Sequence, residues 1–135
     1  MSCDVVLLTI VCVTHYSVGM DTCDAVLATH IQELRRGTVV LAALARLQEP
    51  NYGYALLESM QNAGIEVDAN TLYPLLRRLE KQGLVTSAWD TEGGRPRKYL
   101  HISPDGERVL CALVAEWTRL HGSMQNILKG GSGDE

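Results

Sequence analysis

One segment, residues 68–102, restricts the fold of this 135-residue chain more than any other. Within it, leucines at helical spacing give way after Gly83 to two short runs with the alternation of strands. The segment predicts a helix that begins at a cap, Asp68 or Asn70, and ends at Gln82. A hairpin is expected to follow, with strands at residues 84–91 and 98–102, Val85 and Trp89 sharing one face of the first and Leu100 and Ile102 one face of the second.

Helical spacing also predicts three further helices. The first, at residues 21–47, carries an apolar stripe of Ile31, Leu34, Thr38, Leu41 and Ala45, widened by Leu44 and Leu47. A second, at residues 52–63, is expected to be capped by Asn51 and ended by Gly64. Ser103 and Pro104 form a start signal for a last helix that runs to about Leu128. The order helix, helix, helix, hairpin, helix predicts a mainly α chain with a small β-hairpin, a winged helix-turn-helix.

The charge of the chain is unevenly placed. The formal net charge is −4, yet residues 71–98 hold six basic and three acidic side chains, so this stretch carries +3 and the rest −7. One basic segment in an acidic chain is compatible with nucleic-acid binding through a single face. A solvated charged surface would have the same composition, so the placement of these cations has to decide between the two readings.

The helix that ends at Gln82 divides into two faces. Its leucines, Leu72, Leu75, Leu76 and Leu79, point one way and are predicted to face the core. The outward side carries amide, hydroxyl, phenol and cationic groups that can bond base edges and phosphates. We therefore predict a recognition helix whose contacts come from Asn70, Thr71, Tyr73, Arg77, Arg78 and Lys81. The hairpin tip adds Arg95, Arg97 and Lys98, beside two glycines that permit a tight turn.

These residues carry a resemblance to a known family. The motifs YGYAL at 52–56, NTLYPLLRRLEKQGLV at 70–85 and GRPRKY at 94–99 resemble the PadR family of transcriptional regulators, and the likeness covers roughly residues 31–128. Asn70 stands where Gly or Ala is commoner, and Leu100 where a second aromatic often lies. The resemblance implies a homodimeric winged-helix repressor of the compact subfamily, with one C-terminal dimerisation helix. It also implies DNA contacts from Tyr52, Tyr73, Arg77, Arg95 and Arg97.

The last helix independently predicts a dimer. Leu110, Leu113, Trp117, Leu120, Met124 and Ile127 are spaced three and four residues apart, as in a coiled-coil seam. We expect this seam to pair with the first helix of a second copy, through Leu34 and Leu41. Trp117 in mid-seam either fills the dimer core or, as the resemblance suggests, stacks a planar aromatic or phenolic effector.

The expected domains are an extension at residues 1–20 outside the functional domain, a winged helix-turn-helix at 21–103, a dimerisation helix at 104–128 and a flexible tail at 129–135. The longest apolar run, about nine residues, is far below the roughly 20 of a membrane span. No signal-peptide pattern is present, and the four cysteines lack metal-ligand spacing, which predicts a cytoplasmic protein without metal or cofactor.

An enzymatic function has no support in the sequence. The four histidines fall on unrelated elements, His101 on the outer face of a strand, and no phosphate loop, carboxylate pair or nucleophile motif occurs. Cys111 lies beside the seam and is expected to pack there. We therefore predict a regulator that binds an inverted-repeat operator in double-stranded DNA as a homodimer. The alternative is a winged helix used only for protein contacts, which would predict a neutral or acidic third helix.

Overall fold

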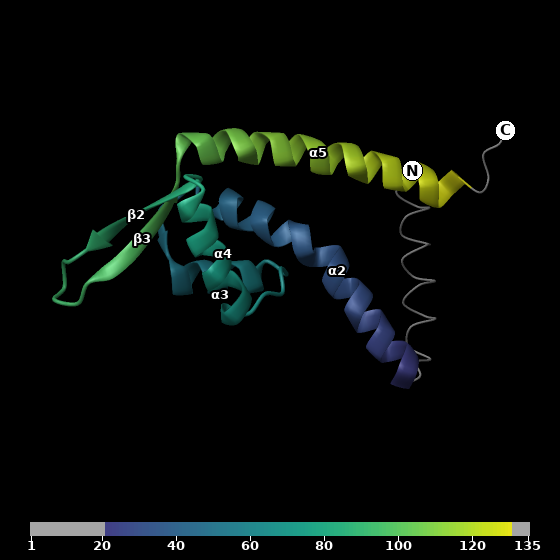
Figure 1. Ribbon diagram of the computed structural model, residues 1–135, viewed down its shortest axis with the longest axis horizontal. Coiled ribbons are helices and arrows are strands. Elements are labelled where there is room, and N and C mark those ends of the chain that lie inside the picture. Colours follow the sequence, from purple (N-terminus) through teal and green to yellow (C-terminus); the bar gives the residue numbers. More distant parts are fainter. Residues whose placement is uncertain (1–20, 131–135) are drawn as a thin grey trace. The chain divides into compact units, whose positions relative to one another are not determined.

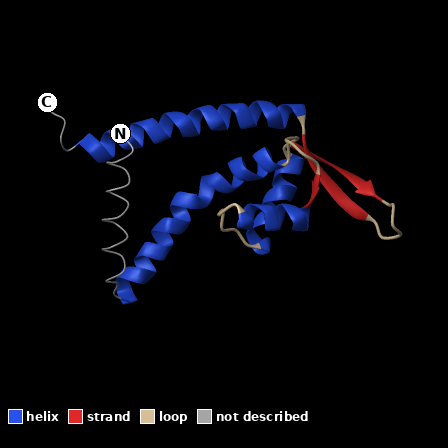
Figure 2. Cartoon of the chain, turned by 180° about the vertical axis from the view of Figure 1, so that it is seen from behind, coloured by secondary structure: helices blue, strands red, loops and turns tan. Residues whose placement is uncertain are grey.

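The computed structural model describes residues 21–130, and the expectations for the extension at 1–20 and for the end of the tail lie outside these residues. The elements, labelled as in Figure 1 and coloured by type in Figure 2, are α2 (Asp21–Arg46), β1 (Asn51–Tyr52), α3 (Gly53–Asn62), α4 (Ala69–Lys81), β2 (Val85–Asp90), β3 (Arg97–Ile102) and α5 (Pro104–Lys129). Each predicted helix is present, and each predicted strand is present within one or two residues of its expected ends.

The chain divides into two compact units. One unit is Arg35–Ala115, which contains the C-terminal part of α2, α3, α4, the sheet and the first part of α5. The other includes the described residues 21–34 and 116–130, the far ends of α2 and α5. Neither of these long helices has the uninterrupted apolar length that crossing a bilayer would require, and no other helix among the described residues has it.

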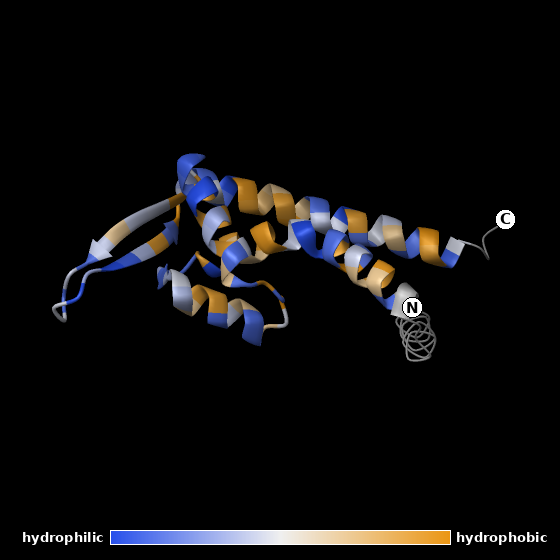
Figure 3. Ribbon diagram, turned by 60° about the horizontal axis from the view of Figure 1, so that its bottom comes forward, coloured by the Kyte–Doolittle hydropathy of each residue, from blue (hydrophilic) through white to orange (hydrophobic). Residues whose placement is uncertain are grey.

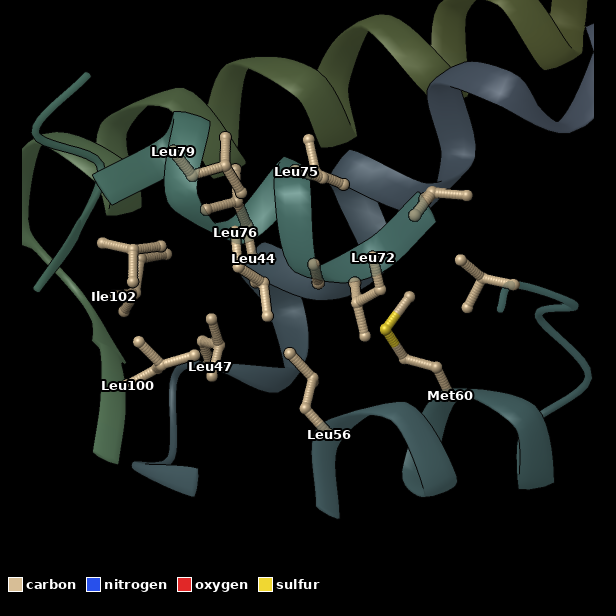
Figure 4. Close-up of a cluster of buried hydrophobic side chains, with 14 of the residues drawn as sticks. Leu44, Leu47, Leu56, Met60, Leu72, Leu75, Leu76, Leu79, Leu100 and Ile102 are labelled. Carbon is tan, nitrogen blue, oxygen red and sulfur yellow. The ribbon is translucent and has the colours of Figure 1, made fainter. Parts of the chain in front are cut away.

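A leucine-rich core holds the Arg35–Ala115 unit together. The four leucines of α4 are buried, which confirms its predicted inward face, and they meet apolar side chains from α2, α3 and β3 (Figure 4). These partners are Leu44, Leu47, Leu56, Met60, Leu100 and Ile102. Fully burying one leucine contributes about 1.5–3 kcal/mol, so these contacts are a main source of the stability of the unit.

The apolar stripe predicted on the first helix is confirmed only at its C-terminal end, where Leu44 and Leu47 are buried. In α2 the buried positions are Val39, Ala43 and Leu44, and Leu47 is buried in the turn that follows. Ala45 is exposed and Leu34 is 80% exposed, although both belonged to the expected stripe. The predicted stripe began at Ile31, whereas the positions buried in the core of the Arg35–Ala115 unit begin at Val39.

The sheet has three antiparallel strands, in the order β1-β3-β2, where the sequence predicted two. Asn51 does not cap the second helix: it pairs with Leu100 in β3, and Tyr52 pairs with Tyr99. The side-chain oxygen of Asn51 accepts from the backbone N–H of Tyr52, which is itself the N-cap of α3 and offers no side-chain bond. Cross-strand hydrogen bonds satisfy this backbone, so the chain stays extended until α3 begins.

Two further side chains differ from expectation. Trp89 lies on the same face of β2 as Val85, but Val85 is 1% exposed and Trp89 is 66% exposed, because the hairpin extends beyond the helices (Figure 1). Cys111 is exposed instead of packed. The exposure predicted for His101 is confirmed.

The junction between the sheet and α5 is tightly built. Ser103 caps α5 as predicted: its hydroxyl donates to the carbonyl of Gly83 at 2.6 Å and accepts from the N–H of Gly106 at 2.9 Å. Gly83 ends α4 with φ of +79°, a value that L-residues with side chains rarely adopt. One buried hydroxyl thereby joins the end of α4 to the start of α5.

Candidate nucleic-acid interface

The outward face of α4 is open to solvent. Asp68 caps the helix by accepting from the N–H of Thr71 at 2.9 Å, which decides between the two predicted caps. Arg77, Arg78 and Lys81 are exposed, and none of them has an ion-pair partner within the described residues. Three cations on one helix, opposite a fully buried leucine face, form a surface suited to phosphates and guanine edges.

Position in the helix gives two of these cations a structural role as well. Arg78 and Lys81 occupy the last turn of α4, where positive charge stabilises the helix dipole by about 0.3–1 kcal/mol. Arg77 lies one residue earlier, outside that turn. Arg77 is therefore the side chain whose removal tests DNA contact with the least effect on helix stability.

Tyr73 is half-buried, and its ring lies against the first residue of α3. Its ring carbon Cε1 lies 3.3 Å from the place that a Cβ on Gly53 would occupy, at the first residue of α3. A larger residue at position 53 would push the ring away. Of the residues predicted on α4, Tyr73 is thus the one that the fold already uses, while Asn70 and Thr71 are exposed in the first turn.

The loop between β2 and β3 forms the tip of a wing, defined here as residues 85–102. Gly93 and Gly94 turn the chain with φ of +87° and +82°, and Arg95 follows, exposed and without an ion pair among the described residues. Lys98 is engaged: its Nζ lies 3.0 Å from Glu80 of α4. Glu80 also accepts from Ser87 at 2.6 Å, and the bonds from Ser87 and Lys98 lower its pKa.

The opposite face of the wing carries an aromatic cluster. Tyr52 stacks on Tyr99 with ring centroids 4.3 Å apart, and its hydroxyl donates to Asp90 at 2.8 Å. The guanidinium of Arg97 lies 4.5 Å from the centre of the Tyr52 ring, and its Nη1 donates to the Tyr54 hydroxyl at 3.2 Å. Two predicted DNA contacts, Tyr52 and Arg97, are therefore partners of each other.

The same contacts shift three pKa values. Hydrogen bonding with Tyr99 and Asp90 raises the pKa of the Tyr52 phenol. The bond from the Tyr52 hydroxyl, and then the N–H of Glu92, lower the pKa of Asp90. Attraction to Tyr52, together with the bond to Tyr54, raises the pKa of Arg97. Asp90 is accordingly an anion at neutral pH, held beside the cation of Arg97.

The structure separates the ten predicted DNA contacts into two groups. Asn70, Thr71, Arg77, Arg78, Lys81 and Arg95 are exposed on α4 and on the wing tip. Tyr52, Tyr73, Arg97 and Lys98 instead have partners within the fold. Sequence reasoning missed those partners, Tyr54, Glu80, Asp90 and Tyr99. The strand alternation of Tyr99 with Leu100 was a signal that Tyr99 lies on the outer face of β3, opposite the core.

The residues predicted for a dimer interface also divide. Leu110 is buried in the core of the Arg35–Ala115 unit and Leu113 is partly buried against it, so Leu110 is not available to a partner. The rest of the seam is exposed, at 53% for Trp117, 47% for Leu120, 48% for Met124 and 67% for Ile127. Figure 3 shows the recurrent apolar positions along α5. Trp117 stacks on His121, with ring centroids 5.8 Å apart.

Three packed helices and a small sheet with a projecting hairpin define a winged helix-turn-helix protein, as predicted. The sequence model of the transcriptional regulator PadR-like family matches residues 40–112, which run from α2 into α5. The chain belongs to the PadR-like family of transcriptional regulators, and the resemblance noted in its motifs is confirmed.

Individual relatives agree with this assignment. The transcriptional regulator Rv3488 of Mycobacterium tuberculosis is 32% identical over 81 residues, which cover 59% of this chain and 76% of that protein. A crystal structure of a PadR family transcriptional regulator from Eggerthella lenta is 46% identical, with a TM-score of 0.76, over 81% of this chain and 97% of its own. A PadR-like transcription factor from Bacteroides fragilis is 31% identical, with a TM-score of 0.61, and the match covers 73% of this chain and 98% of that one.

Proposed function

We propose that this regulator is a repressor that binds an inverted-repeat operator as a homodimer, with α4 in the major groove and the wing tip on the flanking backbone. The observation that carries the proposal is the outward face of α4, where Arg77, Arg78 and Lys81 are exposed without ion-pair partners among the described residues. Unpaired cations have no ion pair within the protein to break when they meet phosphates, and their binding releases counterions from DNA. Arg95 adds a further cation at the wing tip.

A substitution at Arg77 tests this proposal. Removing an arginine that reads a base costs about 1–3 kcal/mol of binding free energy and relaxes specificity at that position. The probe is a duplex selected from a random DNA pool by the wild-type protein, and binding is followed by fluorescence anisotropy at several salt concentrations. We expect Arg77→Ala to weaken binding to this duplex about fivefold to tenfold or more. A fivefold to tenfold loss corresponds to the lower end of the range of about 1–3 kcal/mol.

The matched control is Arg108→Ala on α5. Arg108 is exposed and paired with Asp105 in its own helix, outside the predicted contacts, so its loss should leave DNA affinity unchanged. Equal affinities for wild type, Arg77→Ala and Arg108→Ala would contradict the recognition-helix assignment. Selection of no duplex even at low salt would favour the alternative, a winged helix that serves only protein contacts.

The homodimer is supported by the exposed apolar residues of α5. Trp117, Leu120, Met124 and Ile127 lie on one helix face and are each about half exposed or more. A row of large apolar side chains in water is typical of an interface between subunits. We expect sedimentation analysis to give a dimer for the wild type and a monomer for Leu120→Asp. Asn126→Asp introduces the same charge on a different side of α5 and should remain a dimer, whereas a monomeric wild type would refute the proposal.

Trp117 is the proposed site for an effector. Its indole is 53% exposed and stacks on His121, which provides a flat polarizable surface for a planar aromatic or phenolic compound. A ligand that binds one arrangement of the dimer more tightly would shift DNA affinity by that difference. Titration of Trp89→Tyr protein, in which Trp117 is the remaining tryptophan, should show quenching of its fluorescence. No quenching by planar aromatic cations or phenols, with the dimer intact, would leave Trp117 as a packing residue.

A further inference from the structure

We infer that Tyr52, Asp90 and Arg97 form a clamp that sets the position of the wing. Arg97 then acts on DNA by placing Arg95 and not through its own charge. This inference rests on the proposed DNA-binding function and assigns Arg97 a different part in it. The clamp is defined as Tyr52, Asp90 and Arg97, with Tyr54 and Tyr99 as its neighbours.

The clamp joins every strand of the sheet to the start of α3. Tyr52 is the last residue of β1 and the N-cap of α3, so its ring is fixed relative to the helix-turn-helix. The ring contacts Tyr99 and Arg97, both in β3, and its hydroxyl donates to Asp90 at the end of β2. A movement of either wing strand relative to α3 would break at least one of these contacts.

The opposite face of the hairpin is tied as well. Side chains alternate between the two faces of a strand, so the adjacent residues Arg97 and Lys98 point in opposite directions. Lys98 and Ser87 bind Glu80 of α4, while Arg97 binds Tyr52, the N-cap of α3, and Tyr54 in its first turn. A two-stranded hairpin is marginally stable by itself in water. Contacts on both faces, next to its loop end, would give this one a defined direction.

Electrostatics also separate Arg97 from Arg95. Asp90 is the cross-strand partner of Arg97, so its negative charge offsets part of the positive charge at this end of the hairpin. The face of the guanidinium is occupied by the Tyr52 ring, and Nη1 is occupied by Tyr54. Arg95 has no such acidic partner among the residues described, so its charge is available to a phosphate. The two arginines of the GRPRK tip thereby have distinct roles.

A lysine at position 97 distinguishes the two roles. Arg97→Lys keeps the positive charge but loses the planar fork that stacks on Tyr52 and donates to Tyr54. The probe is the duplex selected from random DNA by the wild-type protein. We expect Arg97→Lys to lose affinity about fivefold, close to the loss in Arg97→Ala, with the slope of log affinity against log salt unchanged in both. Arg95→Ala, the matched control for a phosphate contact, should reduce the slope by about 0.9 for each phosphate that it no longer neutralises.

A measurement without DNA tests the clamp by itself. Arg97→Lys and Tyr52→Leu should each speed amide hydrogen exchange in residues 86–99 of the free protein, and the double variant should add little to either. Arg95→Ala should leave exchange as in the wild type. Tyr52→Leu is used only if its circular dichroism spectrum matches that of the wild type. Arg97→Lys changes an exposed residue and keeps its charge, so it tests the clamp even if Tyr52→Leu does not fold.

Two results would overturn the inference. One is wild-type affinity in Arg97→Lys combined with a reduced salt slope in Arg97→Ala, which would make Arg97 a phosphate contact. The other is wild-type amide exchange in Arg97→Lys, which would show that the wing is placed without the clamp. If the wild-type protein selects no duplex, the proposed function fails, while the exchange experiment still decides whether the clamp holds the wing.

Discussion

Gly106 is the position at which one added methyl group should damage the fold most clearly. It lies in the first turn of α5 and is buried. A Cβ there would lie 2.7 Å from Cγ1 of Ile102 and closer still to the carbonyl oxygen of Leu84, distances that folded proteins do not tolerate. Because the Leu84 carbonyl belongs to the backbone, no side-chain rotation can relieve the clash, and α5 or the start of the sheet has to move.

The magnitude follows from the contacts that this movement disturbs. Overpacking a tight site costs about 1–3 kcal/mol. The Leu84 carbonyl also accepts from the N–H of Ser103 at 3.0 Å, and losing one such bond costs about 0.5–1.5 kcal/mol. Alanine is better than glycine in a helix by at most about 1 kcal/mol, which offsets part of the loss. We expect Gly106→Ala to lower the free energy of unfolding by about 2 kcal/mol, the middle of the roughly 0.5–3.5 kcal/mol that these terms allow together.

Urea unfolding followed by circular dichroism measures this difference. Protein concentration has to be held constant between variants, since association contributes to the stability of a dimer. The control is Gly37→Ala in α2, where nothing lies within 4 Å of the added Cβ. It should stabilise the protein by up to about 1 kcal/mol through helix propensity. A Gly106→Ala protein within about 0.5 kcal/mol of the wild type would refute the argument from close approach.

Three further outcomes are expected. Asp68→Ala removes the cap of α4 and should cost about 1 kcal/mol of unfolding free energy in urea titrations, whereas Asp68→Asn, which still accepts a bond, should cost less. Hydrogen bonds from Ser87 and Lys98 hold the pKa of Glu80 below its ordinary value of 4.5, so the folded state binds fewer protons than the unfolded one. Stability should therefore fall as pH drops below about 4.5 towards the folded-state pKa, and Glu80→Gln should flatten that part of the profile. Deletion of residues 1–19 should leave the melting temperature and DNA affinity unchanged, and a large fall in melting temperature would contradict the expectation that they lie outside the functional domain.

Local patterns in the sequence predicted most of the fold. The four leucines of α4, the caps at Asp68 and Ser103 and the stop at Gly83 all act within a few residues, so spacing alone locates them. β1 was missed because its two residues are strand only through their pairing with β3, nearly 50 residues away in the chain. Asn51 has the side chain of a helix cap, and long-range backbone pairing overrode that local preference.

In the candidate site, too, the sequence predicted what depends on neighbouring residues and missed what depends on contacts between distant elements. Exposure of Arg77, Arg78 and Lys81 follows from the helical repeat that buries the leucines, so the sequence predicted this face without help from the rest of the chain. The partners of Arg97 come from elements that no repeat connects, since Tyr54 is 43 residues away and Tyr52 reaches β3 only through the sheet.

A count of cations therefore overstates the charge that the wing can offer to DNA. Lys98 is paired with Glu80, and Arg97 is engaged by the Tyr52 ring and the Tyr54 hydroxyl. Arg95 is left as the cation of the GRPRK tip without an ion-pair or aromatic partner in the described part of the chain. On this argument the wing should contribute about one phosphate contact per subunit to the salt dependence of binding and not three, and α4 should contribute most of the rest. The fold uses the other two cations to hold the tip in place.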